Sequence, residues 1–230
     1  MLPLVYNICF KQSYYMSFEG YGETGTKVLT AAEALFAEYG YHGVSLRQIT
    51  ARANVNLAAV NYHHSDKQSL YIEILTYRLR QVKQARLAKL EEAENRALGA
   101  PVPLEELVDI LARTLLLPDA PAAHGPAGRR LLGRILIEPL PFTAPILTGE
   151  FQPAMARCGQ AIRRHLPGLP PAKFLWQLSL VAGALHHAAA ALHDMKGHTS
   201  GICRNDDAES ALENFCEFAV ATFTTNRFAT

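Results

Sequence analysis

The order of apolar and polar residues predicts helices along most of the chain. From residue 24 to residue 39, apolar side chains such as Val28, Ala32 and Leu35 recur every three or four positions, which is the period of an amphipathic helix. Gly40 follows this stretch, at the place where a helix that ends in a left-handed residue favours glycine. No segment shows the alternation that is typical of a β-strand. The pattern therefore predicts an all-α fold.

Two short stretches have the sequence of a capping box, in which a serine and a glutamine three positions later bond to each other's backbone amides. Ser45-Leu-Arg-Gln predicts a short helix that runs to about residue 53. Ser65-Asp-Lys-Gln has the same spacing and predicts the start of a long helix that lasts to about residue 95. Both predictions rest on local chemistry.

Between these two helices, Asn54-Val-Asn interrupts the helical pattern. Asn56 is a suitable N-cap for a third short helix, from Leu57 to about residue 62. We therefore expect three short helices that lead into one long fourth helix.

Beyond residue 101, apolar spacing predicts five more helices, and joints rich in proline and glycine separate most of them. The last helix carries an apolar stripe, and acidic residues at its start complement the helix dipole. About nine helices are expected in total. The five predicted here cover residues 103–117, 126–140, 144–166, 171–195 and 206–226.

Charge and composition narrow the class of protein only partly. A chain of 230 residues with 49% hydrophobic residues can bury a sizeable core. Its 22 basic and 21 acidic residues leave a net charge of +1, so any binding to nucleic acid must come from a local patch. Such a patch exists between residues 45 and 67, where Arg47, Arg52 and Lys67 against Asp66 give 3 minus 1, or +2.

Cysteine spacing and hydropathy indicate a reducing compartment and no membrane span. The cysteines form no C-x-x-C pair, which fits free thiols better than a disulfide framework. The longest apolar runs are shorter than the roughly 18 to 20 residues that a membrane span needs. The four cysteines are Cys9, Cys158, Cys203 and Cys216.

The first residues are expected to form a loose extension, residues 1–19. They lack the basic start and the cleavage site of a signal peptide. Met16 precedes a polar stretch, so a start of translation at Met16 instead of Met1 is a hypothesis. The glycines at 20, 22 and 25 spell G-x-G-x-x-G, but no apolar strand precedes them, so a dinucleotide site is disfavoured. Because no G-x-S-x-G motif, Walker loop or H-E-x-x-H motif occurs either, an enzyme has little support from the sequence and is the third interpretation, and no cofactor is expected.

Several motifs in the first third occur together and in register. A helix ending in AAEALFAEYG is followed by G-x-S-x-R-x-I at Gly43, by A-x-V at Ala53, by the pair Tyr62-His63 and by Lys67. This stretch resembles the DNA-binding domain of the TetR family of bacterial transcriptional regulators. Beyond it, the resemblance is to the layout of the family, a variable helical domain.

The resemblance implies a division into a helix-turn-helix DNA-binding domain, residues 20–68, and a helical ligand-binding and dimerisation domain, residues 69–230. It implies a cytoplasmic homodimer that binds a palindromic operator in double-stranded DNA. It also implies that the protein is a repressor and that a small-molecule effector releases it from the operator. For this chain the resemblance implies a hydrophobic effector, such as a fatty-acyl compound.

The matching positions of the motif imply the DNA-contacting residues. A major groove about 12 Å wide admits the second of two short helices, while side chains at the helix ends contact phosphates. Few polar groups face the bases, so thymine methyl contacts and DNA shape are expected to carry much of the sequence discrimination. The expected contacts are Ser45, Arg47, Asn56, Leu57, Ala58, Ala59, Asn61, Tyr62, His63 and Lys67.

Three alternatives stay open at this stage. The family often has an aromatic residue where this chain has His64 and a small residue at Ser65, so the chain could be a helical ligand-binding or dimerisation protein that no longer binds DNA. A metal site at His63 and His64 is disfavoured, because adjacent helical residues point about 100° apart. Any single residue of the motif could also serve only as a cap or in packing.

The second domain is expected to hold the effector pocket and the dimer interface. Small residues on the helix 171–195 would allow close approach of a partner helix, although packing inside one subunit is the alternative. His186, His187 and His193 are interpreted as pocket or core histidines. Predicted pocket residues are Arg134, Glu138, Phe142, Phe151, Trp176 and His187. Predicted interface residues are Ser179, Ala182, Gly183, Leu212, Phe215, Ala219 and Phe223, together with Phe218.

Overall fold

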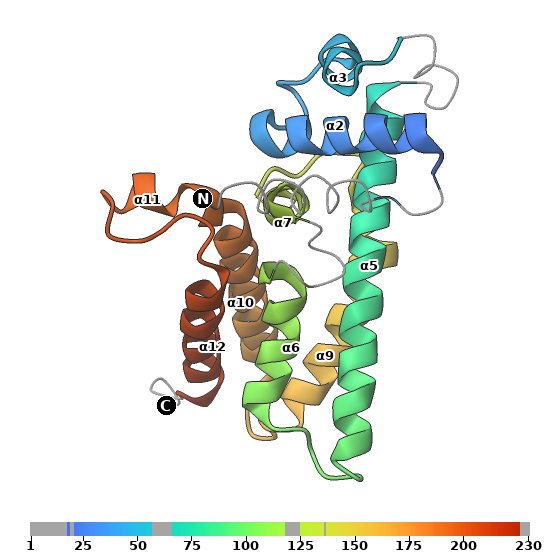
Figure 1. The fold of residues 1–230 in the computed structure, drawn as a ribbon. Coiled ribbons are helices and arrows are strands. Elements are labelled where there is room, and N and C mark those ends of the chain that lie inside the picture. Colours follow the sequence, from blue (N-terminus) through green and yellow to red (C-terminus); the bar gives the residue numbers. More distant parts are fainter. Residues whose placement is uncertain (1–17, 19–20, 57–65, 118–124, 136, 226–230) are drawn as a thin grey trace, which may run out of the picture. The chain divides into compact units, whose positions relative to one another are not determined.

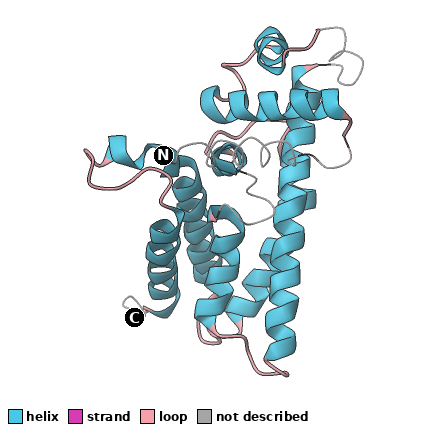
Figure 2. Cartoon of the chain, viewed as in Figure 1, coloured by secondary structure: helices cyan, strands magenta, loops and turns pink. Residues whose placement is uncertain are grey.

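Helices account for all the regular secondary structure in the described part of the chain (Figure 2). The computed structural model describes residue 18 and residues 21–56, 66–117, 125–135 and 137–225. No β-strand occurs within these ranges. The all-α prediction is confirmed.

The chain divides into two compact units, residues 1–78 and residues 79–230. The division falls inside the long helix α5 (Lys67–Arg96), about ten residues beyond the boundary expected at residue 68. The difference arises because the first turns of α5 belong to the hydrophobic core of the first unit, where Leu70 and Ile74 are completely buried.

The first unit consists of α2 (Glu23–Tyr39), α3 (Leu46–Ala53) and the first turns of α5 (Figure 1). Helices α2 and α3 pack against each other. The rings of Phe36 on α2 and Tyr71 on α5 meet in a T-shaped contact, with ring centroids 4.9 Å apart. Gly40 ends α2 at φ 71° and ψ 173°, a conformation that only glycine adopts readily. The predicted glycine stop with a positive φ is confirmed, but its ψ lies outside the left-handed helical region.

A buried ion pair joins α2 to α5 inside this unit. The Nε and Nη2 atoms of Arg78 donate to the two carboxylate oxygens of Glu33 at 2.5 and 2.6 Å, and both side chains are almost fully buried. The guanidinium also lies 4.7 Å from the centroid of the Phe18 ring. Removing one partner of such a pair leaves a bare buried charge, which typically costs about 3–5 kcal/mol.

The second unit is a bundle built on the rest of α5. Helix α10 packs against α6, α7 and α12, and α6 also packs against α9 and α12. In Figure 1, α7 is seen along its axis, crossing the end of the bundle. The main helices are α6 (Leu104–Leu116), α7 (Gly125–Arg134), α9 (Gln152–Arg163), α10 (Pro171–Ala191) and α12 (Ala208–Thr224).

The predicted helix 144–166 is divided in the structure. It consists of α8 (Ala144–Ile146), a π-helical turn η2 (Leu147–Phe151) and α9. Pro153, in the first turn of α9, has no N–H to donate to the carbonyl four residues earlier, so the regular α-helical bonding is interrupted there.

Two further helices are shorter than predicted. Helix α7 ends at Arg134, where the amide of Glu138 closes a turn by donating to the Arg134 carbonyl at 2.7 Å. Helix α10 ends at Ala191, and the chain continues as a 3₁₀ turn, η3 (Leu192–Asp194), and the short α11 (Met195–His198).

The backbones of α7 and α10 approach closely at Gly133. A Cβ atom at this position would lie 2.4 Å from the backbone nitrogen of Ala190 and 2.8 Å from the carbonyl oxygen of His186. Only glycine fits there without a shift of one helix. This contact holds the part of α10 that carries His186 against α7.

The helical stretch Pro171–His198 is long and apolar enough to cross a membrane, judged by length and composition alone. In the structure, α10 packs against α6, α7 and α12, while Leu175, Trp176 and Leu180 on it stay exposed.

Candidate DNA-binding surface and effector cavity

Helix α3 begins with the predicted capping box. The amide of Gln48 donates to Ser45 Oγ at 3.4 Å, and the amide of Ser45 donates to Gln48 Oε1 at 2.8 Å. Ser45 and Arg47 are both exposed, so the start of α3 presents a hydroxyl and a guanidinium to solvent. A helix N-terminus of this kind suits contact with phosphate.

A tight turn follows α3 directly. Asn54 adopts the left-handed conformation, with φ 53° and ψ 49°, and the amide of Val55 donates to the carbonyl of Thr50 at 3.1 Å. This is the bend that a helix-turn-helix places between its two short helices. Asn56 follows the turn and is exposed.

Most of the predicted base-contacting residues lie outside the described residues, since the structure describes nothing between residues 56 and 66. The same holds for His64 and Ser65. The roles of the following residues therefore stay predictions: Leu57, Ala58, Ala59, Asn61, Tyr62 and His63.

Lys67 fastens the loop between α2 and α3 to the start of α5. Its ammonium group donates to the carbonyl oxygens of Tyr41 and Val44, both at 2.9 Å, and lies 4.2 Å from the centroid of the Tyr41 ring. The predicted phosphate contact would use the same ammonium group. Lys67 is thus at least a positioning residue for the start of α3.

The cap of α5 is one residue later than predicted. The amide of Ser69 donates to Asp66 Oδ1 at 2.7 Å, and the amide of Asp66 donates back to Ser69 Oγ at 3.3 Å. The bonds from Ser69 favour the ionised carboxyl and lower the pKa of Asp66. Aspartate competes well with serine as an N-cap, and here the stretch offered both.

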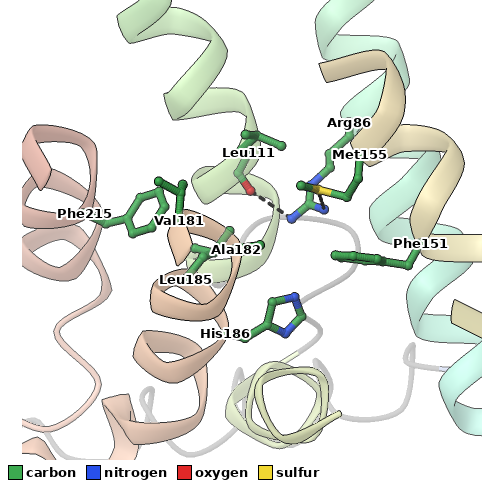
Figure 3. A pocket seen from close by; sticks show the side chains of 9 residues that line it. All are labelled: Arg86, Leu111, Phe151, Met155, Val181, Ala182, Leu185, His186 and Phe215. Atoms are coloured by element: carbon green, nitrogen blue, oxygen red, sulfur yellow. Dashed lines mark hydrogen bonds between the residues drawn. The ribbon is translucent and has the colours of Figure 1, made fainter. Parts of the chain in front are cut away.

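A small enclosed cavity lies in the second unit, among α5, α6, α9, α10 and α12 (Figure 3). Its volume is about 10 Å³, which is room for about one water molecule. Most of the lining is apolar, with one cation and one imidazole. The lining residues are Arg86, Leu111, Phe151, Met155, Val181, Ala182, Leu185, His186 and Phe215.

Arg86 brings a buried positive charge to this cavity. Its Nε donates to Thr114 Oγ1 and its Nη2 to the Leu111 carbonyl, both at 2.9 Å, while Nη1 has the weak acceptor Met155 Sδ at 3.6 Å. The side chain is 1% exposed. Burial lowers the pKa of Arg86 to about 10, so the group is still a cation at neutral pH.

His186 contributes a neutral imidazole to the same cavity. Its Nδ1 lies 2.8 Å from the Leu132 carbonyl, so Nδ1 carries the proton and Nε2 is an acceptor. The ring meets Phe151 edge to face, with centroids 5.6 Å apart (Figure 3). Burial lowers the pKa of His186 to about 4; the bond to Leu132 opposes this, and the charge of Arg86 adds to it.

Of the predicted pocket residues, only Phe151 lines this cavity. His187 lines a wider and more open groove between α10 and α12, with a volume of about 650 Å³. Trp176 is 70% exposed, and Arg134 is paired with Glu138 at 2.6 Å near the end of α7. Phe142 is half-buried in the turn before α8.

Arg86 was not among the predicted pocket residues, although the sequence contains a signal for it. On α5 the buried residues Leu79, Val82, Leu90 and Ala93 follow a spacing of three, eight and three, and Arg86 occupies the middle of that stripe. A basic residue on the core face of a helix is uncommon and points to a particular partner.

The predicted interface residues differ in how exposed they are. Leu212, Phe215, Ala219 and Phe223 on α12 are at most 5% exposed and pack inside the subunit, which is the alternative that the sequence left open. Ala182 is half-buried and lines the cavity. Ser179 and Gly183 on α10 are exposed, and Phe218 on α12 is 48% exposed.

The neutral state of His186 predicts an acid-sensitive second unit. The pKa falls from an ordinary 6.5 to about 4 on folding, so the contribution to stability is complete above pH 6.5 and is lost as the pH falls towards 4. Between pH 7 and pH 5, wild type should lose about 2 kcal/mol more unfolding free energy than His186→Gln. Denaturant unfolding at both pH values measures this, and equal losses in the two proteins would contradict it.

Two family models match the chain. Residues 28–74 match "Bacterial regulatory proteins, tetR family", and residues 105–222 match "Tetracyclin repressor-like, C-terminal domain". No curated protein matches the sequence significantly.

Solved structures share the fold at low sequence identity. FadR of Bacillus halodurans, a fatty acid degradation regulator, has a TM-score of 0.62 at 12% identity, covering 91% of this chain and 99% of its own. A TetR-family transcription regulator from Shewanella sp. PV-4 has 0.53 at 14% identity, covering 86% and 98%. A transcriptional regulator from Saccharomonospora viridis in complex with choline has 0.54 at 16% identity, covering 85% and 95%.

The helical fold, the capped α3 with its left-handed turn, and the two matched models lead to one assignment. Because the second model alone spans more than half of the chain, and the first covers most of α2, all of α3 and the start of α5, the chain belongs to the TetR family of bacterial transcriptional regulators.

Proposed function

We propose that the protein is a cytoplasmic repressor that binds a palindromic operator as a homodimer and leaves it when a small effector with an apolar body binds the second unit. As a member of its family, the chain is a DNA-binding transcriptional regulator with a ligand-binding C-terminal domain, and not an enzyme. The capped α3 followed by the left-handed turn at Asn54 is the observation that carries the DNA-binding part.

The charge distribution around α3 supports a phosphate contact at its start. Arg47 is exposed and forms no ion pair with another described residue. Arg52, by contrast, lies 4.0 Å from Glu38, and the ammonium of Lys67 donates to two carbonyl oxygens. Arg47 is therefore the cation of this surface that is best placed to meet DNA.

Exposed apolar side chains support a dimer interface on α10 and α12. Leu175, Trp176 and Leu180 on α10 are 60 to 70% exposed, and Phe218 lies on the neighbouring α12. Trp176, Leu180 and Gly183 recur at spacings of four and three, so they share one helix face. A second copy related by two-fold symmetry would cover this face.

The apolar lining of the cavity supports an effector with a hydrophobic body, as a fatty-acyl group would provide. The shared fold with a fatty acid degradation regulator is compatible with this class. An effector releases DNA only if it binds the non-DNA arrangement better, and a tenfold change in operator affinity needs about 1.4 kcal/mol of such preference.

Selection from random DNA should return palindromic sites whose half-sites are about one helical turn apart. Arg47→Ala should weaken binding to all of them alike and should lower the slope of log affinity against log salt by about one ion. Arg96→Ala, which removes an exposed cation from the other end of α5, serves as the control and should leave the slope unchanged. Failure to select any palindrome would favour the alternative, a helical ligand-binding protein that does not bind DNA.

Leu180→Glu should convert the dimer into a monomer, because it places a charge in the centre of the proposed apolar face. Sedimentation velocity at micromolar concentration measures the change. Leu98→Glu, at a 92% exposed position in the loop after α5, should remain dimeric. A monomeric wild-type protein would contradict the proposed dimer. A dimeric Leu180→Glu variant would show that the interface lies on another surface.

A further inference from the structure

The guanidinium of Arg86 is a buried cation that no carboxylate among the described residues matches. Its hydrogen-bond partners among the described residues are a hydroxyl, a carbonyl and a thioether, and none of them carries a charge. Cys158 is the acid with which it interacts electrostatically, and burial raises the pKa of that thiol, so Cys158 is neutral at pH 7. The positive charge therefore has no counter-charge within the described residues.

Burying such a charge is expensive. An unpaired ion in a protein interior costs several kcal/mol even after relaxation of its surroundings, which is why buried arginines usually face a carboxylate. Other buried arginines of this chain follow that rule: Arg78 pairs with Glu33, and Arg129 pairs with Asp206 at 2.6 Å. Arg86 differs from both, and it is the one that lines a cavity.

The surroundings of Arg86 restrict the chemical class of a ligand. Nη1 has only the weak Met155 contact, so it can donate to a stronger acceptor. The rest of the lining is apolar apart from the imidazole of His186, whose Nε2 is an acceptor. The cavity thus offers one cationic donor group, one neutral acceptor and a hydrophobic surround.

We propose that the effector is a small monocarboxylate with an apolar body, whose carboxylate takes the place of the missing counter-ion of Arg86. This proposal rests on the proposed function and specifies the effector of that regulator. An ester, alcohol or amide of the same body would leave the charge unmatched. A quaternary ammonium such as choline, which the Saccharomonospora viridis structure contains, would meet a like charge here.

The cavity of about 10 Å³ must enlarge to admit such an acid. Two lining residues are suited to moving. Phe151 is the last residue of the π-helical turn η2, a local irregularity that is frequent at functional sites, and Met155 is an unbranched side chain that repacks easily. Met155 Sδ lies 3.6 Å from Nη1 of Arg86, and Phe151 lines the same cavity (Figure 3).

Calorimetric titration of the dimer with matched probes tests the proposal without DNA. The probes are sodium butyrate, hexanoate, octanoate and benzoate, their methyl esters, and choline. We expect at least one acid to bind below 1 mM and its ester to bind at least tenfold more weakly. If no acid binds at 1 mM, or if the esters bind as well as the acids, the proposal is wrong.

Variants separate the charge of Arg86 from its packing. Arg86→Met should weaken acid binding at least about 30-fold, as expected for the loss of one partner of a buried charge pair. Arg96→Met is the matched control on the same helix and should bind the acid as wild type does. Equal affinity in Arg86→Met and wild type would overturn the assignment. If Arg86→Met does not fold, the comparison of acid with ester in wild type still decides.

A second control tests whether the protein itself supplies the counter-ion. Asp119 is the acidic side chain of the second unit that lies outside the described residues. Asp119→Asn should bind the acid with unchanged affinity. A gain of at least tenfold would show that Asp119 competes for Arg86 and would contradict the proposal of an unmatched charge. Acid binding can succeed or fail independently of operator selection. A failure of the carboxylate proposal can therefore be distinguished from a failure of the proposed regulator function.

Discussion

The buried guanidinium groups of α5 constrain both units of this protein. Arg78 enters the first core and Arg86 the second, and a hydrophobic core tolerates a cation only where partners replace the lost water. For Arg78 the partner is the carboxylate of Glu33, held by two short hydrogen bonds. For Arg86 the described partners are all neutral. One charge therefore stabilises a fold, and the other is available to a ligand.

The first unit uses its charged groups mainly to hold its own shape. Glu33 and Arg78 tie α2 to α5, and Lys67 holds the loop that leads into α3. These contacts fix the start of α3, where Ser45 and Arg47 are exposed. The preorganised helix start is what a phosphate contact requires, since a mobile cation would lose entropy on binding. Different residues therefore serve two purposes: Glu33, Arg78 and Lys67 position the helices, and the exposed Ser45 and Arg47 are the groups proposed to contact DNA.

Local features of the fold could be predicted from the sequence, and long-range ones could not. The capping box at Ser45 and the turn at Asn54 depend on residues a few positions apart, and both are confirmed. The helix start at Asp66 was placed one residue early because serine and aspartate both cap well. The apolar stripe of α12 was visible, but its spacing does not say whether it packs inside the subunit, as Phe215 does, or against a second copy.

The candidate cavity shows the same limit more strongly. Phe151 was predicted, but Arg86 acquires its meaning only from Thr114, Leu111 and Met155, which other helices bring to it. The helix that carries Phe151 and Met155 is interrupted near Pro153, because proline has no backbone N–H to donate. The apolar pattern of the sequence is helical across this point and does not reveal the interruption. Packing of distant segments, and not local propensity, places the charge beside an apolar cavity.

The coupling of the two sites is the central claim, and one measurement tests it directly. Fluorescence anisotropy of a labelled selected operator would be followed as the tightest-binding acid of the series is added to wild type and to Arg86→Met. The account predicts that saturating acid weakens operator binding by wild type about tenfold or more, while the variant keeps its affinity. Equal release from both proteins, or acid binding to wild type without any loss of operator affinity, would contradict it.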